Sequence, residues 1–106
     1  MTDPTPPDAI RSDFAADPDM RELVELFVSE LPERVESIHA AWSENELETV
    51  RRVAHQLKGA CGGYGFRVIG DAAARLEADL KQEEADLERT KDDLDDLIDL
   101  CNRAIV

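Results

Sequence analysis

The sequence predicts an all-α fold, an antiparallel up-down four-helix bundle preceded by a short N-terminal leader. Apolar residues recur at steps of three and four along most of the 106 residues, which is the periodicity of amphipathic helices. The usual strand signals, alternating β-branched runs and Asn-Gly or Asp-Gly hairpin turns, are absent from the sequence. Short connections separate the four apolar stripes, and such connections favour antiparallel neighbours.

A flexible leader is predicted over residues 1–12, which contain three prolines and several small polar residues. The bundle domain is expected to occupy residues 13–106. Its first helix should begin at Asp17 and Pro18, because Asp is a favoured N-cap and Pro is favoured at the first helical position. Pro32 lies in the middle of this helix and predicts a kink or a short break. The first apolar stripe is Met20, Leu23, Val24, Phe27, Val28, Leu31, Val35, Ile38 and Trp42.

The other three helices follow from the same periodicity. Ser43 and Glu46 form the S-x-x-E pattern of a capping box, which should start the second helix. Glycines crowd the end of that helix, and Gly65 is expected to take part in ending it. The second stripe is Leu47, Val50, Val53, Ala54, Leu57, Cys61 and Tyr64, the third is Val68, Ile69, Ala72, Ala73, Leu76 and Leu80, and the fourth is Leu87, Leu94, Leu97, Ile98, Cys101, Ala104 and Ile105.

The chain is strongly acidic, with 12 Lys and Arg against 25 Asp and Glu and a net charge of −13. A nucleic-acid binder should be basic, and an anionic membrane surface would repel this chain, so neither partner is expected. The sequence has no apolar run long enough to span a membrane and no secretory signal. We therefore expect a cytoplasmic protein and a monomer, in which Cys61 and Cys101 remain reduced thiols.

His55 is predicted to point to solvent, because the apolar stripe of its helix lies on the opposite side. Offsets of three, four and seven residues place three cations and two glycines on the same face. They are Arg51, Arg52, Lys58, Gly59 and Gly62. A glycine inside a helix costs about 1 kcal/mol relative to alanine. The glycines, with Gly63 beside them, therefore indicate a surface that a partner's backbone approaches closely.

The cations around His55 also suggest a chemistry. They disfavour positive charge on the imidazole, so we expect a neutral, nucleophilic ring. Residues 50–70 contain four basic side chains and no acid, although the whole chain is acidic. Such a window would neutralise an anion attached to His55. The combination is what a phosphoryl carrier needs.

Three motifs lie on and beyond this helix. They are the pattern His55-x-Leu57-Lys58-Gly59, Gly65 ten residues after the histidine, and Leu76-Glu77. Together they resemble the histidine-containing phosphotransfer (HPt) domain family, over about residues 13–105. Members of this family are four-helix bundles that act as intermediates in multistep two-component phosphorelays.

The resemblance implies that His55 accepts the phosphoryl group and that Lys58 contacts or orients it. It also implies response-regulator receiver domains as partners and a hybrid sensor histidine kinase upstream. Many members carry serine at the two positions after Gly59, where this chain has Ala60 and Cys61, so hydroxyl contacts from those positions are missing. The docking surface is predicted to consist of Arg51, Arg52, Gln56, Gly59, Gly62 and Gly63.

In this interpretation the chain is a covalent carrier rather than a complete enzyme. The sequence contains no G-x-x-x-x-G-K-[ST] motif for ATP. No cofactor or metal of its own is expected, because Mg²⁺ belongs to the receiver domain. The histidines and cysteines, His39, His55, Cys61 and Cys101, also lack the spacing of a metal site.

Other interpretations remain open at this stage. The chain could be the phosphorylatable module of a chemotaxis-type histidine kinase, although a sequence running from Met1 to Val106 suits a free-standing protein better. It could be a pseudo-HPt that binds receivers without phosphotransfer, which His55 and Lys58 argue against. A purely structural helical adaptor would not explain glycines on an exposed face.

Overall fold

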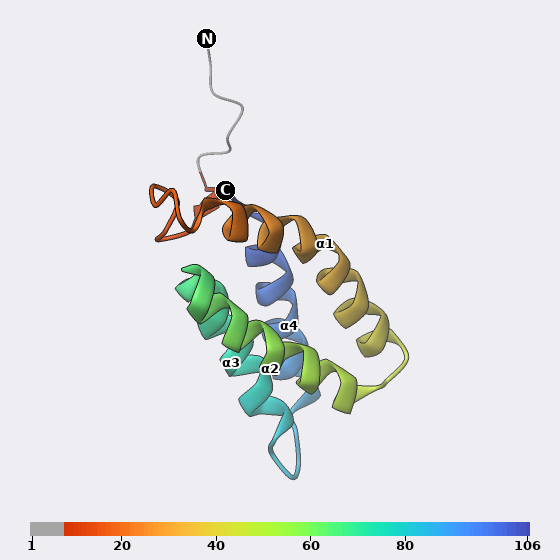
Figure 1. Cartoon of the computed structure of the whole chain (residues 1–106). Coiled ribbons are helices and arrows are strands. Elements are labelled where there is room, and N and C mark those ends of the chain that lie inside the picture. The colour runs from red at the N-terminus through yellow and green to blue at the C-terminus, as the bar shows by residue number, and fades with distance from the viewer. Residues whose placement is uncertain (1–7) are drawn as a thin grey trace.

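The computed structural model describes residues 8–106, and this part of the chain forms four helices and one two-stranded sheet (Figure 1). The prediction of an all-α four-helix bundle is confirmed. Successive helices run in opposite directions, and α2 packs between α1 and α3 while α4 closes the bundle against α3 and α1. The elements are β1 (Ile10–Arg11), α1 (Arg21–Ser43), α2 (Leu47–Tyr64), α3 (Arg67–Leu80), α4 (Leu87–Asn102) and β2 (Ala104–Ile105).

Helix α1 begins later than the sequence predicts. Asp17 does not cap α1 but caps the turn that leads into the helix. The Asp17 carboxylate accepts a hydrogen bond from the Asp19 N–H at 2.9 Å, and the Asp17 carbonyl accepts one from the Arg21 N–H at 3.1 Å. The short break considered at Pro32 does not occur, since α1 continues through it. Leu31 and Ile38 are buried on either side, and their packing outweighs the lost backbone hydrogen bond.

The capping box predicted for α2 does not form, and Glu46 precedes the helix without a side-chain cap. Helix α1 extends to Ser43 instead, and the chain reverses through Asn45, which has a left-handed φ of 61°. The Glu46 N–H donates to the Ala41 carbonyl at 2.8 Å, and the Asn45 N–H donates to the Trp42 carbonyl at 3.0 Å. These are the hydrogen bonds of a Schellman motif, which uses the residues that a capping box would need.

Gly65 ends α2 in the left-handed conformation, with a φ of 80°, as its place in the sequence suggested. The N-terminal segment closes over this turn: the Ser12 hydroxyl donates to the Tyr64 carbonyl at 2.5 Å, and the Asp13 N–H donates to the Gly65 carbonyl at 2.9 Å. A Cβ on residue 65 would lie 2.7 Å from Ser12 Oγ and 2.9 Å from Asp13 N. No other residue type fits this turn without strain.

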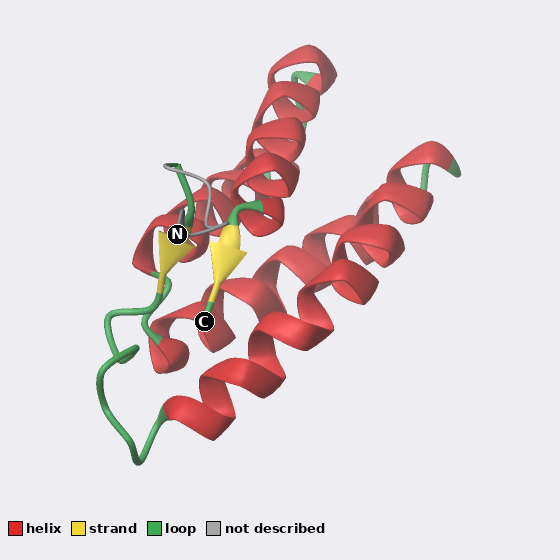
Figure 2. Cartoon of the chain, turned by 90° about the horizontal axis from the view of Figure 1, so that it is seen from above, coloured by secondary structure: helices red, strands yellow, loops and turns green. Residues whose placement is uncertain are grey.

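The sheet was not predicted. Strand β1 pairs in parallel with β2, and the two lie side by side (Figure 2). Of the leader predicted over residues 1–12, residues 1–7 lie outside the described residues, residues 10 and 11 form β1, and Ser12 is buried. Two-residue strands carry no periodicity, and this pairing joins segments at opposite ends of the sequence.

The core comes from all four helices, much as the apolar stripes predicted. Three members of the stripes are exposed instead: Leu23 at the edge of the α1 stripe, Val68 in the first turn of α3, and Leu87 at the start of α4. Cys61 and Cys101 are buried free thiols, as expected, and desolvation raises their pKa to about 12 and about 11. No helix in residues 8–106 is long and apolar enough to cross a membrane.

The turn at Gly65 makes a prediction about stability. Gly65→Ala should lower the free energy of unfolding by more than the about 1–2 kcal/mol of left-handed strain, because the new Cβ also meets Ser12 and Asp13. Gly59→Ala is the matched control, since a Cβ there meets nothing within 4 Å and alanine favours the helix by about 1 kcal/mol. Urea unfolding of both variants measures the difference. Equal effects would show that the turn does not depend on glycine.

Candidate functional site

Helix α2 presents His55 to solvent, as predicted. The His55 side chain is 62% exposed, whereas Ala54 and Leu57 beside it in the sequence are buried in the core. The apolar face of α2 therefore fixes the direction in which the imidazole points. Ordered helical backbone on both sides of His55 holds it on a rigid element.

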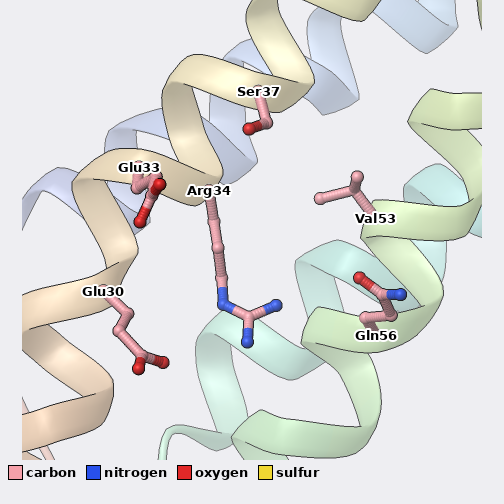
Figure 3. A pocket seen from close by; sticks show the side chains of 6 residues that line it. All are labelled: Glu30, Glu33, Arg34, Ser37, Val53 and Gln56. Carbon is pink, nitrogen blue, oxygen red and sulfur yellow. The ribbon is translucent and has the colours of Figure 1, made fainter.

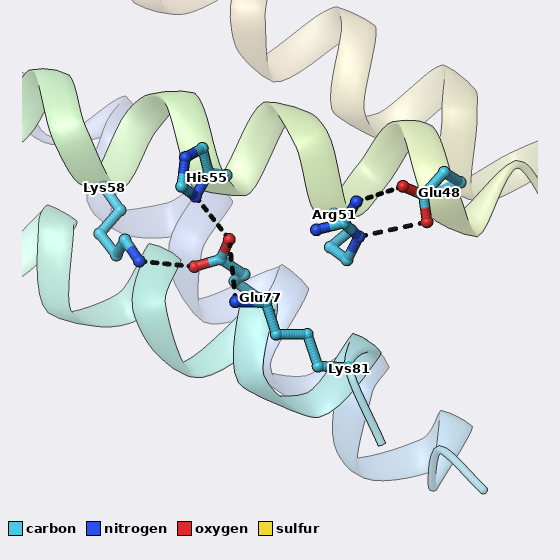
Figure 4. A network of polar contacts seen from close by, with 6 residues as sticks. All are labelled: Glu48, Arg51, His55, Lys58, Glu77 and Lys81. Carbon is cyan, nitrogen blue, oxygen red and sulfur yellow. Dashed lines mark hydrogen bonds and ion pairs between the residues drawn. The ribbon is translucent and has the colours of Figure 1, made fainter. Parts of the chain in front are cut away.

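A buried carboxylate from the neighbouring helix holds His55. The Glu77 side chain on α3 is only 3% exposed, and its Oε2 lies 2.6 Å from His55 Nδ1. Lys58, one turn after His55, donates from Nζ to Glu77 Oε1 at 2.7 Å, and Lys81 Nζ lies 3.7 Å from Oε2 (Figure 4). We call these three side chains, His55, Lys58 and Glu77, the carboxylate network.

The charge of Glu77 follows from these contacts. The hydrogen bond from Lys58 lowers the pKa of Glu77 to about 2, with the bond from His55 adding to the effect and burial opposing it. Glu77 is therefore ionised near neutral pH, and an ionised carboxylate only accepts hydrogen bonds. His55 must then carry a proton on Nδ1, so in the neutral form of the ring the free lone pair lies on Nε2.

The cations predicted around His55 are less free than the sequence suggested. Lys58 is bound to Glu77, and Arg51 is paired with Glu48 one turn earlier on α2 (Figure 4). That pairing lowers the pKa of Glu48. Arg52 is exposed and makes no ion pair within residues 8–106. The basic window is thus largely neutralised by carboxylates that lie outside it in the sequence.

The glycines fall into two groups. Gly59, Gly62 and Gly63 are exposed, and a Cβ added to any of them would meet nothing within 4 Å. Packing inside the chain therefore does not require these three glycines. Their lack of side chains agrees with a surface that a partner approaches closely, and we call Gly59, Gly62 and Gly63 the bare glycines. Gly70 on α3, which the sequence analysis did not single out, is different, because a Cβ there would lie 3.2 Å from Cys61 Cβ. It lets α3 approach α2.

Gln56 lies on another side of α2 from the carboxylate network. It lines a pocket between α1 and α2, together with Val53 and residues of α1 (Figure 3). The structure thus spreads the predicted docking residues over the exposed width of α2, with Gln56 toward α1 and the bare glycines between it and α3.

Sequence reasoning gave no role to Glu77, which appeared only within the motif Leu76-Glu77. A signal was present, because Glu77 follows the buried Leu76 and lies four residues after the buried Ala73, on the apolar side of α3. An acidic residue at such a position needs a partner. That the partners are His55 and Lys58 depends on how α3 packs on α2.

A comparison of the chain with models of known protein families finds a match. The model of the Hpt domain family matches residues 22–105. No curated protein and no solved structure matches the chain. Residues 8–106 contain no group of three or more His, Cys, Asp or Glu side chains that could hold a metal ion.

The carboxylate network makes stability depend on pH. The pKa of Glu77 falls from 4.5 to about 2 on folding, so its contribution is fully present above pH 4.5 and is lost as the pH falls toward 2. Glu77→Gln should therefore destabilise the protein at pH 7, and the difference from wild type should shrink over that interval. Urea unfolding at pH 7, 4 and 2.5 measures it.

Glu48→Gln is the control for Glu77→Gln. Glu48 also pairs with a cation, but it is exposed, and solvent screening leaves such pairs little effect on stability. A variant difference for Glu77→Gln that stays constant with pH, or equals that of Glu48→Gln, would contradict the role given to the buried carboxylate.

Proposed function

The chain belongs to the Hpt domain family, and from that premise we propose that it carries a phosphoryl group on His55 between receiver-domain aspartates of a multistep phosphorelay. Membership supports a histidine phosphotransfer module, which carries a phosphoryl group. The choice of His55 rests on one observation. It is an exposed histidine whose Nδ1 is held by the buried carboxylate of Glu77.

The proposed transfer uses the nitrogen that the carboxylate network leaves free. The His55 Nε2 lone pair attacks the phosphorus of a receiver's aspartyl phosphate. A P–N bond forms as the P–O bond to the aspartate breaks, and the aspartate leaves as a carboxylate. The imidazole gains positive charge in this step, and ionised Glu77, 2.6 Å from Nδ1, stabilises it. The reverse sequence delivers the group to the next receiver.

Lys58 has two roles in this proposal. It holds Glu77 ionised, and its side chain remains 41% exposed beside the histidine, where it reduces the negative charge of the arriving phosphoryl oxygens. Positioning and charge neutralisation dominate phosphoryl transfer, so a rigid helix with these groups suffices. The Mg²⁺ that such transfer uses is expected on the receiver domain, and this chain needs no cofactor of its own.

The partners are proposed to be response-regulator receiver domains, with a hybrid sensor histidine kinase upstream. They would meet the chain on the docking surface, where Gly59, Gly62 and Gly63 leave the backbone beyond His55 uncovered. A cytoplasmic monomer is the form in which we expect these encounters. The acidic remainder of the chain discourages docking elsewhere.

Phosphate transfer from a phosphorylated receiver tests the assignment. Incubation should place acid-labile, base-stable phosphate on the wild-type chain, and His55→Gln should abolish the labelling. His39→Gln is the matched control, because His39 is an exposed histidine on α1 without a buried carboxylate partner in residues 8–106. Label retained by His55→Gln would show that another residue accepts the phosphoryl group. Receiver binding without any label would support the pseudo-HPt interpretation.

A second experiment tests the docking surface. Gly62→Gln should leave the bundle folded, since the new side chain enters open space, but should weaken receiver affinity by about tenfold or more by blocking close approach. Ala40→Gln places the same side chain on an exposed position of α1 and should leave affinity unchanged. Isothermal titration with the receiver compares the two. Equal affinities would remove the reason given for the bare glycines.

A further inference from the structure

Arg34 on α1 differs from most cations of this chain. Nine of the 12 Lys and Arg side chains lie within 4.0 Å of a carboxylate in residues 8–106, as expected where acidic residues number 25. Of the other three, Arg11 donates to the Val106 carbonyl, and Arg52 is exposed beside His55. Arg34 is the third, and it is half-buried.

A local partner is within reach of Arg34 and is not used. Glu30 lies four residues before it, and an acid four residues before a cation is the favourable order for a helical ion pair. A pair of this order does form elsewhere in the chain, between Asp99 and Arg103 at 3.3 Å. The Arg34 side chain instead extends from α1 toward α2 (Figure 3). Packing between the two helices therefore directs the guanidinium away from its neighbours in the sequence.

The guanidinium lies in a pocket of about 240 Å³ between α1 and α2. Val53 and Gln56 of α2 form the side opposite Arg34, while Glu30, Glu33 and Ser37 accompany it on α1 (Figure 3). Arg34 Nε is buried and has no hydrogen-bond partner within residues 8–106. A buried, unsatisfied donor on a charged group is costly unless something else completes its hydrogen bonds.

We propose that Arg34 and Gln56 form a subsite for a carboxylate side chain of the docked receiver domain. The proposal rests on the proposed function. Gln56 lies three residues before Gly59 on α2, so the two are neighbours on the helix surface and the pocket adjoins the docking surface. A guanidinium binds a carboxylate through two parallel hydrogen bonds, and the Gln56 amide adds a further donor. The subsite would strengthen receiver binding without touching the transferred phosphoryl group.

The pocket favours an anion delivered by a protein over a free one. Glu30 and Glu33 are exposed at its edge, and their charges repel a small anion that has no other contacts. A receiver already seated on the bare glycines brings its carboxylate to Arg34 at a high effective concentration. The acidic edge thus makes the subsite selective for a partner that fits the rest of the surface.

Variants of Arg34 test the subsite with the receiver that transfers phosphate to His55 fastest. Arg34→Ala should weaken its affinity about tenfold in isothermal titration and reduce the salt dependence of binding, while the transfer rate at saturating receiver stays near wild type. Arg34→Lys keeps the charge and most of the stem but not the fork, so it should recover only part of the affinity. Arg75→Ala is the control, because Arg75 pairs with Asp96 between α3 and α4.

If a thermal melt shows that Arg34→Ala is not folded, a charge-reversal variant still tests the subsite. Arg34→Glu should bind the wild-type receiver poorly and should be rescued by one receiver variant in which an Asp or Glu becomes Lys. Failure of every such variant to rescue, or wild-type affinity for a folded Arg34→Ala, overturns the subsite while labelling of His55 still stands. Absence of labelling by any receiver would overturn both proposals. Saturable binding of sodium acetate would show a general anion pocket and also overturn the proposed selectivity.

Discussion

The carboxylate of Glu77 is the constraint around which this molecule is arranged. An ionised carboxylate can be buried only where hydrogen bonds and opposite charge compensate the loss of water. The two groups that hydrogen-bond Glu77, His55 Nδ1 and Lys58 Nζ, come from α2, so burial of Glu77 ties α3 to one face of that helix. The same contacts fix the imidazole tautomer. A buried carboxylate thereby orients an exposed imidazole on the surface.

Close packing of α2 and α3 makes the network possible, and glycine contributes in two distinct ways. Gly70 lets the helices approach, since a Cβ there would lie 3.2 Å from Cys61 Cβ, and Gly65 provides the left-handed turn between them. Gly59 and Gly62 are needed for neither purpose. Packing within the described residues does not compensate their cost to helix stability, which supports the proposed docking of a receiver domain at these positions.

The cations of this chain also divide into those paired within the chain and those left for a partner. The acidic side chains of this chain neutralise most of its cations, including Arg51 and Lys58 near the histidine. The local positive charge suggested by the sequence is therefore small. Arg52 and Arg34 are the cations near α2 that carboxylates of the described residues leave unpaired. An incoming acidic partner would meet these two positions rather than a broad basic patch.

The sequence by itself determined the four helices and the exposure of His55, because apolar periodicity fixes which face of a helix is buried. It also carried the family motifs around His55 and the turn at Gly65. The end of α1 depended on a local competition that apolar periodicity does not resolve, since Asn45 closed α1 with hydrogen bonds that displaced the expected capping box. Only the tertiary structure decided the partner of His55 and the direction of Arg34, because each depends on side chains far apart in sequence that meet only when the helices pack.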